Sequence, residues 1–124
     1  MTLRRILFVA LGGTVGTAAR LALGLVIPAT GGFPLAVLLA NIVGAFLIGV
    51  LAARLPGSTD LRLLLGTGVL GGFTTYSAFM TGTLALWTDA PLLAVAYAVG
   101  SLVLGLAAAA LGLRLARPRR GVVA

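Results

Sequence analysis

The chain has almost no ionisable side chains other than arginine. It contains no cysteine, histidine, lysine or glutamate, and its acidic residues are two aspartates, Asp60 and Asp89. Without cysteine there are no disulfides, thiolate nucleophiles or thiolate metal sites. Without histidine the commonest metal ligand and the proton relay of neutral pH are missing. Enzymatic chemistry has very few side chains to use, so we do not expect an enzyme.

Charged residues are also too few for a water-soluble domain. Only 9% of the 124 residues are charged and 60% are hydrophobic, with a mean hydropathy of +1.20, whereas about a quarter of an ordinary soluble domain is charged. A helix needs about 20 apolar residues to cross a hydrocarbon core about 30 Å thick. Four such helices and their turns use nearly the whole chain, so we predict one all-α membrane domain.

Turn-forming residues divide the chain into four apolar runs. Turn clusters follow Pro28 and Pro56, and Pro91 is favoured in the first turn of a helix. The predicted spans are residues 3–27, 33–53, 61–87 and 91–113, followed by a basic tail at 114–124. No alternating pattern suggests a membrane barrel, so helices are the expected spanning element.

Arginines fall almost entirely on one side of this predicted membrane domain. With four spans, both termini and the loop between spans two and three share one side, and the other two loops carry no arginine. The eight arginines on that side are Arg4, Arg5, Arg54, Arg62, Arg114, Arg117, Arg119 and Arg120. The positive-inside rule predicts that this side is the cytoplasmic face of the inner cell membrane. Because these arginines flank apolar runs and form no solvated basic face, we predict no nucleic-acid partner.

Glycines spaced four residues apart mark two small helix faces. Gly12 and Gly16 lie in the first span, and Gly68 and Gly72 lie in the third. Such spacing lets helix backbones approach closely in a membrane. We interpret both pairs as packing surfaces.

The centre of the third span contains residues that packing alone does not require. From Gly71 to Phe79 the sequence reads GGFTTYSAF, in which a glycine pair precedes a group of hydroxyl and aromatic side chains. A helix break in hydrocarbon frees backbone groups, which protein, water or an ion must satisfy. The stretch predicts a break at the glycine pair, and two interpretations fit it. One is a ligand site, and the other is a kink whose freed carbonyls bond the hydroxyls of Thr74 and Thr75.

Other polar residues within the spans each have two interpretations. The Asn41 amide either bonds a neighbouring helix or donates to an anion. Arg20 either extends to the membrane surface or faces a water-filled cavity, where it attracts anions. Tyr97 and Ser101 share one helix face and continue a hydrogen-bonding path, unless Ser101 bonds within its own helix.

The motifs together resemble the Fluc (CrcB) family of fluoride channels over nearly the whole chain. In span one the motif is GGTVGTAAR, ending at Arg20. In span two it is FP at Phe33 followed by Asn41 and Gly44, and in span three it is GGFTTYSAF. The resemblance implies an antiparallel dimer with two fluoride pores and a buried sodium ion. It also implies a passive channel through which cytoplasmic fluoride leaves down its gradient, relieving fluoride toxicity.

Carried over by motif position, the resemblance implies a role for each polar residue. The backbone carbonyls of Gly71 and Thr74 hold the sodium ion, and Arg20 lies in a vestibule. The residues implied for the fluoride pore are Asn41, Thr75, Tyr76, Ser77, Phe79, Tyr97 and Ser101. Two positions depart from the family pattern, because Tyr76 replaces a phenylalanine and Ala78 replaces the usual threonine. Either departure would alter the path or weaken one pore.

Two other classes of function fit a four-span chain of this length. A small proton-coupled multidrug exporter also dimerises antiparallel, but it needs a membrane-embedded glutamate, and this chain has none. A non-conducting membrane scaffold or assembly subunit would use its glycines for packing alone.

The distribution of arginine also predicts the kind of partner. A chain that inserts in both orientations needs nearly balanced positive charge, whereas this chain has eight arginines on one side and none in the opposite loops. We therefore predict a hetero-dimer with an oppositely oriented paralogue, with the homodimer as the alternative.

Overall fold

A computed structural model describes residues 1–29, 31–57 and 59–119. Four of its helical segments are long and apolar enough to cross a membrane, namely Leu3–Val26, Leu35–Arg54, Asp60–Asp89 and Pro91–Ala116. The predicted fold class, an all-α membrane chain of four spans with a break in the third, is confirmed. Arg120 and the rest of the predicted tail after it lie outside the described residues, as do Thr30 and Ser58 in the turns.

Three of the spans are single continuous helices. Helix α1 (Leu3–Val26) begins after Thr2, whose hydroxyl accepts a hydrogen bond from the Arg5 N–H. Helix α2 (Leu35–Arg54) follows a turn in which Gly31 and Gly32 have φ values of 62° and 79°, a conformation that glycine adopts without steric cost. Helix α6 (Pro91–Ala116) has proline in its first turn, as the sequence predicts.

The third span is a composite of four segments. It consists of α3 (Asp60–Arg62), the π-helix η1 (Leu63–Leu70), α4 (Gly71–Phe73) and α5 (Tyr76–Asp89). The non-helical residues at the break are Thr74 and Thr75. The predicted position of the break was therefore wrong by one turn, because the glycine pair stays helical. The π-helix was not predicted.

The first and third spans pack backbone against backbone through the predicted glycines. A Cβ atom added to Gly12 would lie 2.9 Å from the Gly68 Cα, and one added to Gly16 would lie 2.8 Å from the Phe73 nitrogen. A Cβ on Gly72 would meet the carbonyl of Gly13. These distances exclude a side chain, so the interpretation of the glycine pairs as packing surfaces is confirmed.

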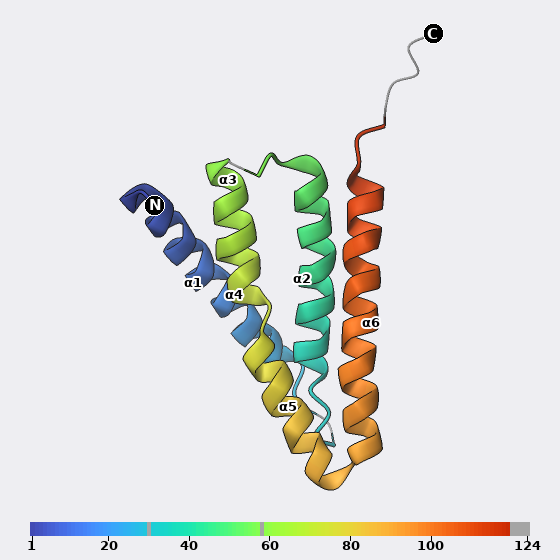
Figure 1. Ribbon diagram of the computed structural model, residues 1–124. Helices are drawn as coiled ribbons and strands as arrows, with labels where there is room; N and C mark the ends of the chain where they lie inside the picture. The colour runs from blue at the N-terminus through green and yellow to red at the C-terminus, as the bar shows by residue number, and fades with distance from the viewer. Residues whose placement is uncertain (30, 58, 120–124) are drawn as a thin grey trace.

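The second and fourth spans form another close pair, which the sequence analysis missed. Helices α2 and α6 run side by side for most of their length (Figure 1). A Cβ on Gly49 would lie 2.8 Å from the Leu113 nitrogen, and one on Gly112 would meet the Phe46 carbonyl. These two glycines are 63 residues apart in sequence, so no local spacing indicates the contact.

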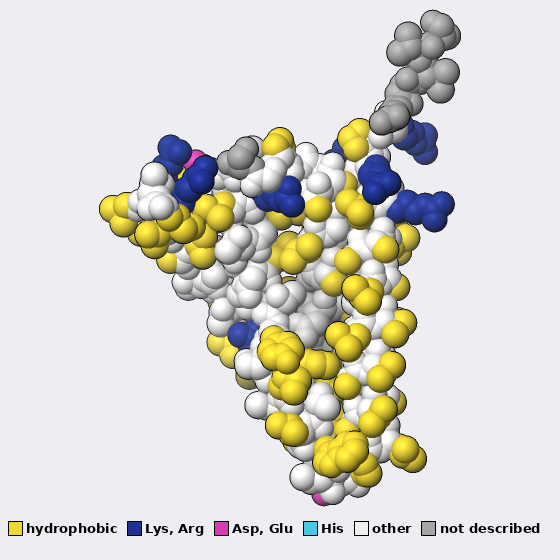
Figure 2. Space-filling view, in the orientation of Figure 1, with side chains coloured by type: hydrophobic (Ala, Val, Ile, Leu, Met, Phe, Trp, Pro, Cys, Tyr) yellow, Lys and Arg dark blue, Asp and Glu magenta, His cyan; other side chains and the backbone are white. Residues whose placement is uncertain are grey.

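The arginines gather at one end of the bundle. The start of α1, the end of α2, the start of α3 and the end of α6 lie at the same end in Figure 1, and Figure 2 shows most of the basic side chains at this end. Asp60 lies there too, with its carboxylate oxygens 2.8 Å from Arg4 Nη2 and 3.4 Å from Arg5 Nε. We call this the arginine end. Asp89, the last residue of α5, closes the third span at its other end.

Candidate functional site

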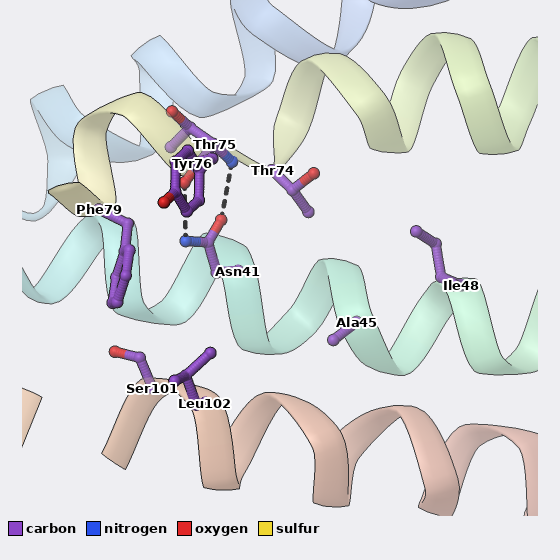
Figure 3. A pocket seen from close by; sticks show the side chains of 9 residues that line it. All are labelled: Asn41, Ala45, Ile48, Thr74, Thr75, Tyr76, Phe79, Ser101 and Leu102. Atoms are coloured by element: carbon purple, nitrogen blue, oxygen red, sulfur yellow. Dashed lines mark hydrogen bonds between the residues drawn. The ribbon is translucent and has the colours of Figure 1, made fainter. Parts of the chain in front are cut away.

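The break in the third span is fixed by the side chain of Asn41. The Thr75 N–H donates to Asn41 Oδ1 at 2.8 Å, and Asn41 Nδ2 donates to the Thr75 carbonyl at 3.0 Å (Figure 3). A backbone N–H only donates and a carbonyl only accepts, so this pairing defines the orientation of the amide. Asn41 thus bonds a neighbouring span, which is the first of its two interpretations. The amide nitrogen carries a second N–H, so donation to an anion is compatible with the same geometry.

The Thr75 side chain begins helix α5. Its buried hydroxyl accepts from the Ala78 N–H at 3.1 Å and lies 3.3 Å from Ser77 Oγ. A threonine hydroxyl in this position satisfies one of the free N–H groups of the first helical turn. The two hydroxyls predicted at the start of α5 are therefore in contact with each other.

The Thr74 hydroxyl points back along the span. Its Oγ1 donates to the Leu70 carbonyl at 2.8 Å. The Leu70 carbonyl also keeps its helical donor, the Thr74 N–H at 2.9 Å, so it is not a freed carbonyl. The kink interpretation, in which both threonine hydroxyls bond freed carbonyls, is thus wrong for Thr74 and for Thr75. For Thr75 the reason is that it caps the following helix, so its oxygen is used as an acceptor.

Two carbonyls at the break lose their usual helical donors. The donor to Gly71 in a continuous helix is the Thr75 N–H, which is diverted to Asn41. The donor to Thr74 is the Ala78 N–H, which is diverted to the Thr75 hydroxyl. Backbone oxygens freed in this way have the chemistry that hard cations prefer. The described residues contain no group of three or more His, Cys, Asp or Glu side chains that offers another metal site.

Of the two carbonyls that lie between Gly71 and Thr74, that of Gly72 is bonded by the first span. Arg20 Nε donates to the Gly72 carbonyl at 3.2 Å, and Thr17 Oγ1 reaches the same oxygen at 3.5 Å. Arg20 also lines a cavity of about 430 Å³ beside α1 and α2. Of the two interpretations of Arg20, the cavity therefore fits, and its bond to the Gly72 carbonyl was not predicted. The sequence analysis also missed Thr17, although a hydroxyl three residues before an arginine within a span indicates a shared polar face.

A cavity of about 310 Å³ lies where α2, the break and α6 meet (Figure 3). The residues that line it are Asn41, Ala45, Ile48, Thr74, Thr75, Tyr76, Phe79, Ser101 and Leu102. We call this the central cavity. Five of the seven residues predicted for the pore line it, and the exceptions are Ser77, which contacts Thr75, and Tyr97.

Aromatic rings extend from the central cavity towards the end opposite the arginines. The ring centroids of Tyr76 and Phe79 are 6.3 Å apart, and those of Phe79 and Tyr97 are 5.5 Å apart. The Tyr97 ring meets Phe33 edge to face, also at 5.5 Å. Tyr76 is 76% exposed, whereas Tyr97 is only 3% exposed. The row therefore begins at an open face of the chain and ends in its buried core.

Two buried hydroxyls beside this row have no hydrogen-bond partner among the described residues. They are Tyr97 Oη and Ser101 Oγ. Ser101 therefore does not bond within its own helix, so that interpretation was wrong. Ser101 lines both the central cavity and a second cavity of about 280 Å³, which Tyr97 and Phe33 also line. An unpaired buried hydroxyl is costly, so both groups are suited to meet water or a ligand.

Residues 7–113 match a family model described as CrcB-like protein, Camphor Resistance (CrcB). The chain belongs to the CrcB family. This confirms the resemblance found in the sequence, and the match covers all four membrane spans almost completely.

Relatives with a name are similar along about nine tenths of the chain. The chain is 46% identical over 113 residues to the fluoride-specific ion channel FluC of Paracoccus denitrificans, covering 88% of this chain and 91% of that protein. It is 46% identical over 119 residues to a FluC of Thermus thermophilus, covering 91% and 95%. The FluC of Novosphingobium aromaticivorans is 45% identical over 118 residues, covering 89% and 94%.

Proposed function

We propose that this chain is a fluoride-selective channel through which cytoplasmic fluoride leaves passively, relieving fluoride toxicity. The observation that carries the proposal is the broken third span. Asn41 holds Thr75 in a non-helical conformation, and the break places Tyr76 and Phe79 at the central cavity. Close CrcB relatives that carry the name fluoride-specific ion channel support the same function. A channel of this kind is not an enzyme, in agreement with the lack of catalytic side chains.

Fluoride is small and tightly hydrated, so a selective path must replace its water with other donors. The second N–H of Asn41 and the unpaired hydroxyls of Ser101 and Tyr97 supply such donors along one wall. The edges of Tyr76 and Phe79 carry the positive part of the ring quadrupole and bind an anion weakly. Weak binding at several sites lets the ion leave as readily as it enters.

Proton-coupled export does not fit this arrangement. Asp60 and Asp89 are the first and last residues of the third span, so neither carboxylate lies inside the membrane. Asp60 is also paired with Arg4 and Arg5. A passive pathway for an anion needs no carboxylate within the spans, and both aspartates of this chain lie at the ends of the third span.

We further propose that the carbonyls of Gly71 and Thr74 hold a structural sodium ion. Both oxygens lose their helical donors at the break, which suits them to a hard cation. A sodium ion bound there would supply positive charge that stabilises the freed carbonyls.

An antiparallel dimer is the assembly that we propose, because one chain leaves the site open. The Tyr76 ring, which the family resemblance assigns to the pore, is 76% exposed in the single chain. A hetero-dimer with an oppositely oriented paralogue is favoured, because one end of the chain carries most of the positive charge and the chain should therefore insert in a single orientation. The described arginines at that end are Arg4, Arg5, Arg54, Arg62, Arg114, Arg117 and Arg119. We place the chain in the inner cell membrane. By the positive-inside rule, both of its termini then face the cytoplasm.

Fluoride efflux from liposomes, recorded with a fluoride electrode, tests the function. We expect fluoride flux, without chloride flux, from vesicles that contain this chain together with its paralogue, or this chain alone if it forms homodimers. Absence of flux from the assembled dimer would contradict the proposal. Phe79→Ala then separates a channel from a scaffold, because a channel loses flux while it still dimerises and a scaffold loses assembly.

The orientation is tested separately. Reporter fusions to the C-terminus should give only a cytoplasmic signal. Equal cytoplasmic and external populations would overturn the hetero-dimer and restore the homodimer.

A further inference from the structure

Another cavity, of about 390 Å³, lies at the arginine end between α2 and the third span. The residues that line it are Ile48, Leu51, Gly57, Arg62, Leu63, Gly66 and Thr67. We call it the Arg62 cavity. Neither Arg62 nor Thr67 has a role in the pore described above, and Arg62 entered the sequence analysis only as a topology signal.

Arg62 brings an uncompensated positive charge to this cavity. Its Nη1 donates to the Leu55 carbonyl at 3.1 Å, which holds the partly buried guanidinium beside Gly57. The nearby carboxylate of Asp60 is paired with Arg4 and Arg5 instead. Within the described ranges, Arg62 forms no ion pair, and a guanidinium has five N–H donors of which one is used here. The remaining donors can serve an anion.

The π-helix shapes the wall opposite α2. Three of its residues, Leu63, Gly66 and Thr67, line the cavity. Arg62, at the end of α3, and Thr67, five residues later in the π-helix, both line the cavity. The wider i→i+5 winding favours this shared side, whereas α-helical winding would turn two residues five apart away from each other. A Cβ on Gly66 would lie 3.0 Å from Leu51 Cδ2, so the glycine also keeps the wall open.

The Arg62 cavity is adjacent to the central cavity. Ile48 lines both, just as Ser101 lines both the central cavity and the one beside Tyr97. The three cavities therefore form a series from the arginine end to the buried aromatic core, with Ile48 as the wall between the first two.

We propose that the Arg62 cavity is a vestibule that collects small inorganic anions and passes them beyond Ile48 to Asn41. The proposal rests on the proposed fluoride channel and adds an anion-binding site to it. Arg62 and the Thr67 hydroxyl bind the anion loosely, and the local concentration of fluoride rises at the arginine end. A cleft lined by charge of one sign raises the local concentration of the opposite ion, and added salt weakens this effect.

The variant Arg62→Gln tests this role in the assembled channel. At low ionic strength and sub-saturating fluoride, we expect flux about threefold to tenfold lower than in the wild type. The difference should disappear at saturating fluoride or at high ionic strength, because the charge acts on concentration and not on the pore. Arg114→Gln removes a charge from the same end at an exposed residue outside the cavity, and it should match the wild type.

Each outcome of this comparison decides the proposal. A lower flux in Arg62→Gln than in the wild type, found only at low salt and low fluoride, supports it. Equal flux in Arg62→Gln and the wild type overturns it, as does a loss of the same size under all conditions, which indicates a structural role. A wild type without flux contradicts the proposed function instead.

A second variant tests the same proposal if Arg62→Gln does not fold. Thr67 is exposed, so Thr67→Asp introduces a carboxylate into the cavity at a tolerant position. We expect the same dependence on salt and fluoride concentration, with Thr67→Asn as the neutral control. Equal flux in Thr67→Asp and Thr67→Asn would overturn the proposal.

Discussion

The α2–α6 pair and the broken third span solve the same packing problem in different ways. Both use glycines to bring backbones together, Gly49 and Gly112 in the pair and Gly16 and Gly72 at the third span. Only the third span interrupts its helix. Close packing in the membrane therefore does not require a break. The reason for the break must instead lie in the backbone groups and side chains that it makes available at the central cavity.

The two regions also differ in their side-chain hydrogen bonds. Apart from the ion pairs of Arg4 and Arg5 with Asp60 at the arginine end, the side-chain hydrogen bonds found between different spans in the described part of the chain gather around the break. These bonds join Thr17 and Arg20 to Gly72, and Asn41 to Thr75. Among the described residues, no side-chain hydrogen bond found here joins α2 to α6, and the two backbones meet closely at Gly49 and Gly112. The comparison predicts that changes in the pair affect folding, whereas changes at the break affect conduction first.

The largest expected effect is on folding, from Gly112→Val. A side chain at Gly112 would meet the Phe46 carbonyl, so α2 and α6 must separate. We expect destabilisation of about 3 kcal/mol or more, with loss of a monodisperse peak in size-exclusion chromatography. Gly105→Val is the matched control on the same helix, because a Cβ there meets no atom within 4 Å. Equal folding of the two variants would contradict backbone contact in this pair.

The next effect is on conduction, from Asn41→Leu. This variant removes both hydrogen bonds that hold Thr75 and leaves its N–H and carbonyl unsatisfied, at a cost of about 1–3 kcal/mol for each group. We expect fluoride flux to fall by about 100-fold, since each 1.4 kcal/mol corresponds to a factor of ten, while the dimer still elutes intact.

Thr81→Val is the control for the loss of a polar side chain. The Thr81 hydroxyl bonds only the Ala78 carbonyl of its own helix, at 3.2 Å. Flux should remain close to the wild-type rate. If Asn41→Leu conducts as well as Thr81→Val does, the break is not what positions the pore.

The sequence predicted the four spans well because the membrane itself imposes their length. About 20 apolar residues must be continuous, and proline, glycine and arginine mark where each run stops. The break was placed one turn early because a glycine pair is a local signal. Its actual position depends on Asn41, which lies 34 residues from Thr75 in the chain. Such a contact leaves no trace in local composition.

The π-helix illustrates the same limit. Nothing in the residue types of Leu63–Leu70 distinguishes wider winding from an α-helix, and the segment is packed along Gly12 and Gly16 of the first span. The candidate polar residues were found because side chains such as Asn41 and Arg20 are rare within a membrane span. Which atoms they bond is decided by the fold, so those contacts were not predictable.

A smaller effect is expected from Thr75→Val. The Thr75 hydroxyl caps α5 by accepting from the Ala78 N–H, and losing such a cap costs about 1 kcal/mol. We expect about a fivefold decrease in flux, with Thr75→Ser retaining most of it because serine keeps the acceptor. Similar flux in the valine and serine variants would show that the start of α5 is positioned without this bond.

The smallest effect is expected from Tyr76→Phe, which tests the departure of this chain from the family pattern. Tyr76 is exposed, and its hydroxyl forms no hydrogen bond with any described residue, whereas its ring lies 6.3 Å from Phe79. If the ring edge is the part that meets the anion, phenylalanine provides the same edge, and flux should stay within about twofold. Tyr76→Leu has no ring edge and should lose much more flux. Parallel measurements of fluoride efflux for the two variants therefore locate the contribution of Tyr76 in its ring or in its hydroxyl. A large change in Tyr76→Phe would show that the tyrosine hydroxyl is itself a donor in the path, which would make this end of the break more polar than its single-chain geometry indicates.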